Sequence, residues 1–116
     1  MEEFTHKEKI ATLRLVSEIM YADQRIDEQE VKYFWELTKS FGLDESCKAE
    51  VDNLQTEEAL SAVSCMSEEQ KGFVAQMMGR MIVVDRDINY NEVVLYNSYC
   101  KGLNIDKEFD ADDFPF

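Results

Sequence analysis

A short acidic turn occurs twice in this chain, and its spacing limits how the chain can fold. The two copies occupy residues 22–31 and 84–93, and each follows the pattern Asp-x-x-Ile-(Asp/Asn)-x-x-Glu-Val. Equivalent positions lie 62 residues apart in a chain of 116 residues. A repeat at about half the chain length predicts two related halves, each built from the same kind of unit.

Nearly every segment carries the signals of a helix. Thr5 and Ser67 are good N-cap residues, and each is followed three positions later by Glu or Gln, which completes a capping box. Asp27 and Asn89 are the corresponding caps inside the two acidic turns. The expected helices run from Thr5 to about Ala22, Asp27 to Gly42, Asp44 to Val51, Thr56 to Val63, Ser67 to Ile82 and Asn89 to Asn104.

Apolar residues recur at helical spacing within these segments, which predicts one all-α domain over residues 1–105. The methionines at 77, 78 and 81 belong to such a stripe and are interpreted as core, as is Trp35. The remaining residues, 106–116, are acidic and contain three Phe. They are expected to form a loose tail, a strap that packs on the body, or a docking segment.

The net charge of −13 restricts the partners of the protein. Nucleic acid is not expected as a direct partner, because binding phosphates requires a basic surface. Divalent cations or a basic protein surface would be attracted instead, although an acidic surface also serves solubility alone. No apolar run is long enough for a membrane span, so no direct membrane insertion is expected. With three unpatterned cysteines and no signal peptide, the protein is expected to be cytoplasmic with reduced, mostly buried thiols.

The acidic turns allow two interpretations. In the first, Asp27, Glu30, Asn89 and Glu92 only cap helices, and the other acids are solvated. Asp23 and Asp85 do not fit it, because each follows the end of a helix, where the macrodipole disfavours a carboxylate. In the second interpretation the two turns hold a divalent cation, and oxygen ligands favour Ca²⁺ or Mg²⁺. The candidate metal ligands are Asp23, Glu30, Asp85, Glu92, Asp27, Asp87 and Asn89.

Residues 85–89 also resemble the start of an EF-hand loop, but Tyr90 replaces the required Gly and Tyr96 the closing Glu. A different resemblance is more extensive. Residues 21–30, with the flanking helices and Phe41-Gly42-Leu43, resemble the TerB-like family, which includes tellurite-resistance proteins and the N-terminal region of certain DnaJ-like co-chaperones. The second turn is a more degenerate match, with Val84 and Arg86 at positions where that family usually has Ala and Gly.

The resemblance implies an all-α fold of about seven helices in two pseudo-symmetric halves, so six to seven helices are expected. It also implies acidic site residues at Asp23, Glu30, Asp85 and Glu92, and a role in stress resistance through protein contacts. The leading hypothesis is therefore a non-enzymatic module that binds a divalent cation and an unknown protein partner. The alternatives are an interaction module without metal and, remotely, a metal-dependent hydrolase. His6 is the only histidine and is interpreted as structural.

Overall fold

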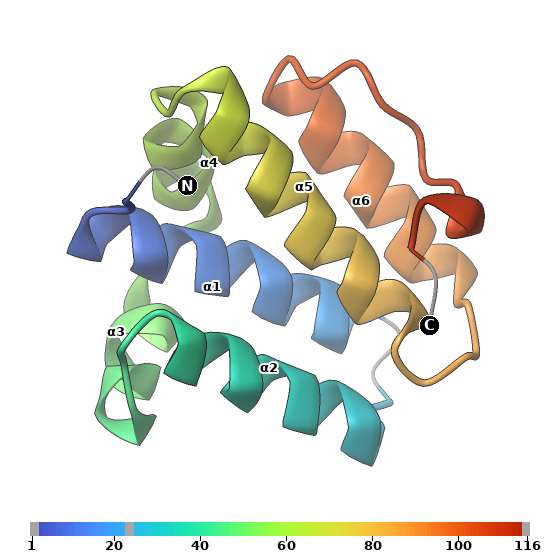
Figure 1. Ribbon diagram of the computed structural model, residues 1–116, viewed down its shortest axis with the longest axis horizontal. Helices are drawn as coiled ribbons and strands as arrows, with labels where there is room; N and C mark the ends of the chain where they lie inside the picture. The colour runs from blue at the N-terminus through green and yellow to red at the C-terminus, as the bar shows by residue number, and fades with distance from the viewer. Residues whose placement is uncertain (1–2, 23–24, 115–116) are drawn as a thin grey trace.

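The protein is all-α in a computed structural model that describes residues 3–22 and 25–114 (Figure 1). Within these residues there are six α-helices, two short 3₁₀ helices and no strand. The number of helices agrees with the expectation from the sequence. The elements are α1 (His6–Tyr21), α2 (Glu28–Ser40), η1 (Glu45–Cys47), α3 (Lys48–Asn53), α4 (Thr56–Ser64), α5 (Glu68–Val83), α6 (Tyr90–Gly102) and η2 (Ala111–Asp113).

Helix α1 is the centre of the molecule and packs against all five other α-helices. In Figure 1 it crosses the middle of the view between α2 and α5. Its apolar residues point to more than one side, and Leu13, Leu15, Val16 and Ile19 are fully buried. A helix that is apolar around most of its circumference must be covered on several sides. The sequence of α1 therefore accounts for its central place.

The two halves of the chain are related by the offset of 62 residues. Helix α5 has the bounds of α1 shifted by 62, and α6 has the bounds of α2 shifted by 62. The predicted caps Thr5, Asp27, Ser67 and Asn89 all accept a backbone N–H at the start of their helix. These caps, each worth about 1 kcal/mol, fix where the helices begin.

The helix ends repeat in the same way. Gly42 and Asn104 both adopt a left-handed conformation, with φ of 77° and 60°. The next residue then bonds back to its helix: Leu43 N donates to Thr38 O at 3.1 Å, and Ile105 N to Cys100 O at 2.8 Å. These are the bonds of a Schellman motif, which ends both helices at equivalent points.

The middle of the chain departs from the prediction. Asp44 caps η1, and the helical segment reaches Asn53, two residues past Val51. Thr56, the predicted cap of α4, is the first residue of that helix, and Gln55 is the N-cap without a side-chain bond. The Thr56 hydroxyl instead donates to Glu18 Oε1 at 2.5 Å. A tertiary contact has taken the side chain that the local pattern assigned to capping.

The C-terminal segment is a strap on the body. The Phe109 amide donates to Asn97 Oδ1 at 2.7 Å, which anchors the strap to α6. Phe114 is only 2% exposed, and its ring lies 6.4 Å from the ring of Tyr96, edge to face. A Cβ placed on Gly79 would lie 2.0 Å from Cζ of Phe114, so only glycine leaves room for this ring. Figure 1 shows the strap running back along α6 to η2.

Candidate functional site

The two acidic turns lie together and enclose one hollow of about 160 Å³. The turn between α1 and α2 and the turn between α5 and α6 both lie at the same end of the molecule (Figure 1). Four carboxylates and one guanidinium line this acidic hollow, so its walls are strongly negative. The lining residues are Arg25, Ile26, Asp27 and Glu30 from the first turn, and Asp85, Asp87 and Asn89 from the second.

The first turn is organised by a reciprocal cap. Asp27 Oδ1 accepts the Gln29 amide at 2.7 Å, and Glu30 Oε1 accepts the Asp27 amide at 3.0 Å. Glu30 is only 1% exposed although it is acidic. Its position in the first turn of α2 stabilises it, because the helix macrodipole is positive there. Capping therefore already uses one oxygen of each of these two carboxylates.

The second turn has the same plan with different contacts. Asp85 Oδ1 accepts the Asp87 amide at 3.0 Å, and Asn89 Oδ1 accepts the Asn91 amide at 2.8 Å. Arg86 takes the left-handed conformation, with φ of 63°, at the position where the TerB-like pattern has Gly. Glu92 is 1% exposed in the first turn of α6, as Glu30 is in α2. The backbone of the turn is thus kept although its sequence is degenerate.

Five of the seven predicted site residues line the acidic hollow. They are Asp27, Glu30, Asp85, Asp87 and Asn89. Glu92 is buried beside the turn and does not line the hollow, and Asp23 lies outside the described residues. Within residues 3–22 and 25–114, no three His, Cys, Asp or Glu side chains are grouped as ligands of one metal ion. The turns thus meet as a negatively charged hollow rather than as a formed coordination sphere.

The same end of the molecule carries apolar side chains that the sequence analysis did not single out. Within the described part of the chain, five large apolar residues are exposed, and all belong to the two turns or to the helix residues beside them. Exposed apolar groups gathered in one region are typical of contact surfaces. We name these residues the turn patch: Tyr21, Ile26, Ile88, Tyr90 and Val94.

A polar network that the sequence pattern did not reveal joins three helices behind this end. Glu18 on α1 lies 2.9 Å from Arg14 Nε, accepts the Thr56 hydroxyl from α4, and accepts the Tyr99 hydroxyl from α6. Burial and the bond to Glu18 raise the pKa of Tyr99. The i,i+4 spacing of Arg14 and Glu18 was the one local signal. It does not reveal which residues from α4 and α6 complete the network.

Comparisons with known proteins bear on the fold alone. No family model and no curated protein matches the chain. Among solved structures, a protein of unknown function, PG1108, from Porphyromonas gingivalis W83 is similar, with a TM-score of 0.79 and 21% sequence identity. The alignment covers 97% of this chain and 88% of that one. This arrangement of helices therefore occurs in a second protein of distant sequence.

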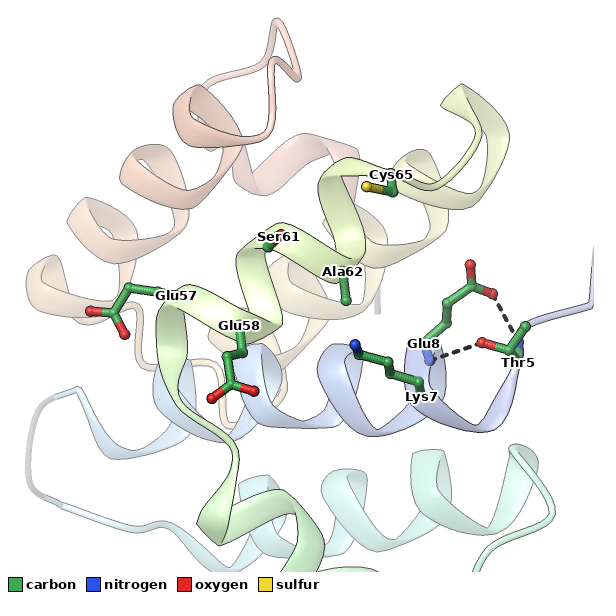
Figure 2. A pocket seen from close by; sticks show the side chains of 8 residues that line it. All are labelled: Thr5, Lys7, Glu8, Glu57, Glu58, Ser61, Ala62 and Cys65. Carbon is green, nitrogen blue, oxygen red and sulfur yellow. Dashed lines mark hydrogen bonds between the residues drawn. The ribbon is translucent and has the colours of Figure 1, made fainter.

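The largest hollow is a shallow groove of about 490 Å³ between the start of α1 and α4 (Figure 2). Thr5 and Glu8 at one edge bond each other in the capping box, and the exposed thiol of Cys65 lies on the α4 side. Across the described residues, no helix is both long and apolar enough to span a membrane. The groove offers an accessible thiol but no grouping of catalytic side chains.

Cys65 is expected to react alone with a thiol reagent in the folded protein. All three cysteines are free, and Cys47 and Cys100 are buried. Burial raises the pKa of both buried thiols, so they form less of the reactive thiolate. Titration with Ellman's reagent at pH 8 should release one equivalent from the native protein and three in denaturant. Rapid release of a second equivalent from native protein would show that a buried thiol is accessible. The expectation that the thiols are mostly buried holds for the other two.

Proposed function

We propose that the protein is a non-enzymatic helical module that engages a protein partner through the end formed by its two turns. The turn patch carries this proposal, because every exposed large apolar residue of the described chain belongs to it. Contact regions of proteins commonly combine apolar side chains with a polar rim. Here the rim is acidic, with Asp27, Asp85 and Asp87 around the hollow.

The chemistry of the acidic hollow supports a binding role over catalysis. Its described lining consists of carboxylates, one amide, one guanidinium and Ile26, without His, Cys, Ser or Lys. It therefore lacks the pairing of a nucleophile with a base that covalent catalysis requires. The charge of −13 favours a partner with a basic surface and speeds its approach. The TerB-like resemblance adds the expectation that such contacts serve stress resistance, which stays a prediction.

The test is affinity capture of partners with the full chain and two variants that each add one negative charge. Tyr90→Glu changes the most exposed residue of the turn patch, at 78% exposure. It places an acid in the first turn of α6, where acids favour the helix. Asn53→Glu adds the same charge at an exposed position at the end of α3. A partner enriched by wild type and Asn53→Glu, and lost with Tyr90→Glu, is the expected result. Identical capture by all three proteins contradicts the proposal.

A second candidate function is weak binding of Ca²⁺ or Mg²⁺ in the acidic hollow. The observation that favours it is the meeting of carboxylates from both turns around 160 Å³. Arg25 in the lining opposes it by placing a positive charge there. An NMR titration with each ion tests it: saturable shifts of amides in both turns support binding. Shifts that are absent at millimolar ion, or that remain in Asp27→Asn and Asp85→Asn, exclude it.

A further inference from the structure

The repeat relates the groove that holds the strap to a second hollow, in the first half of the chain. Phe114 packs on Gly79 and Tyr96, and the positions 62 residues earlier are Asp52, Ser17 and Phe34. All three of these earlier residues line one apolar hollow of about 160 Å³ between α1, α2 and α3. The hollow thus occupies the place, in the first half, that Phe114 fills in the second.

The two places differ in the residue that comes from the segment after the second helix of each half. In the second half, that residue is Phe114, which is buried. In the first half it is Asp52, whose carboxylate is about half exposed and pairs with Lys48 Nζ at 2.7 Å. An aspartate turned toward a lysine leaves the apolar hollow without a ring. Only the floor is similar, since Ser17 and Gly79 are both small.

The size and lining of the hollow suit an aromatic side chain. A dry cavity of about 150 Å³ is enough to bind benzene in an engineered protein, and this hollow has a similar volume. Its walls include Phe34 and Trp35, whose rings pack edge to face at 5.3 Å. Aromatic pairs favour such geometry, so a third ring would find favourable contacts. Tyr21 and Ile26 of the turn patch lie at its border.

The neighbouring charge indicates what should flank that aromatic residue. Ile26 lines both this apolar hollow and the acidic hollow, so the two share a wall. Four carboxylates against one guanidinium give the acidic hollow a net charge of −3, by subtraction. A ligand that fills the apolar hollow therefore has a negative region beside it. A second copy of the chain, with a charge of −13, fits this region poorly.

We propose that the apolar hollow between α1, α2 and α3 is a socket for an aromatic side chain of a partner segment, with adjacent basic residues in the acidic hollow. The socket is the counterpart of the groove in which the chain binds its own Phe114. The inference rests on the interaction role proposed above and does not depend on a bound cation. It adds to that role one anchor residue, its place of binding and the charge of its neighbours.

The test uses three short amidated peptides as probes: Lys-Lys-Phe-Lys-Lys, Lys-Lys-Ala-Lys-Lys and Glu-Glu-Phe-Glu-Glu. Trp35 is the only tryptophan of the chain and lines the socket, so its fluorescence reports occupancy. The first peptide should change this fluorescence and shift the amides of Ser17 and Val51. Replacing Phe by Ala should weaken binding at least about tenfold, as burial of one aromatic side chain predicts. The acidic peptide should bind more weakly than the first.

Asp52→Phe provides the matched variant, because it places a ring at the position equivalent to Phe114. It should fill the socket from within and weaken the Lys-Lys-Phe-Lys-Lys peptide at least about tenfold. Asn53→Phe adds a ring at the neighbouring exposed position and should leave binding unchanged. Equal binding of the Phe and Ala peptides, shifts that avoid Ser17 and Trp35, or undiminished binding to Asp52→Phe would overturn the proposal.

Two further outcomes separate this inference from its alternatives. Self-association of the protein that Asp52→Phe abolishes would assign the socket to a second copy, and overturn a basic partner. Capture of a partner that depends on Tyr90, together with failure of the peptides, would remove the socket and leave the interaction role standing. Measurements in chelator and in millimolar Mg²⁺ should both show peptide binding, because the aromatic contact needs no ion. Binding only in Mg²⁺ would contradict the proposal.

Discussion

Replacing Phe114 by Ala is expected to lower the free energy of unfolding by about 3 kcal/mol. The substitution removes a fully buried aromatic side chain, which typically costs about 3–5 kcal/mol in a core. The lower end applies because the strap follows the last helix and can detach without unfolding the body. For a domain of this size the melting temperature should fall by roughly 12 °C. Thermal and urea unfolding measure the change, and a loss below about 1 kcal/mol would contradict the packing of the strap.

Gly79 provides an internal control for this contact. In the wild type, Gly79→Ala should destabilise the protein, because the added Cβ would lie 2.0 Å from Cζ of Phe114. In the Phe114→Ala background the obstacle is absent, and the same substitution should stabilise α5 by about 1 kcal/mol through helix propensity. A change of sign between the two backgrounds is the expected signature. Equal effects in both would place Phe114 elsewhere.

The second large effect is expected at Glu18, where Ala should cost about 3 kcal/mol. The carboxylate is 16% exposed and accepts from Thr56 and Tyr99 while it pairs with Arg14. Its removal leaves a largely buried guanidinium and two hydroxyl groups without this acceptor, and such losses are among the most costly. Urea unfolding of Glu18→Ala against wild type measures the change.

Asp52 serves as the matched control, since it also forms an i,i+4 pair, with Lys48. Both side chains of that pair are about half exposed, and exposed pairs contribute little. Asp52→Ala should therefore leave the unfolding curve almost unchanged. Tyr99→Phe, which removes a single partner of Glu18, should lie between the two. A Glu18→Ala curve that coincides with that of Asp52→Ala would show that the network stabilises nothing.

The sequence predicted the fold where the determining contacts are local. Thr5, Asp27, Ser67 and Asn89 bond residues two or three positions away, so their identity and spacing alone set the helix starts. The left-handed ends follow from Gly42 and from Asn104, since these two residue types tolerate a positive φ. The fold class and the pseudo-symmetry therefore followed from patterns within a few residues.

The remainder depends on contacts between distant parts of the chain. Nothing near Phe114 indicates that Gly79 leaves room for its ring, so a loose tail and a strap could not be separated. Thr56 has the sequence signal of a cap, but its hydroxyl is used by Glu18 on another helix. At the site, the repeat predicted that the two turns would be equivalent and near each other. Which of their carboxylates face the shared hollow depends on how α2 and α6 are rotated.

The most direct test of the central claim, that both turns form one contact surface, compares Ile26→Ala with Ile88→Ala. These residues occupy equivalent positions in the two turns and are 50% and 45% exposed, so neither change should affect folding. Binding of the captured partner to each variant, measured by calorimetry, should be weaker than binding to wild type in both cases. If only one substitution weakens binding, or neither does, the two turns do not form a single surface.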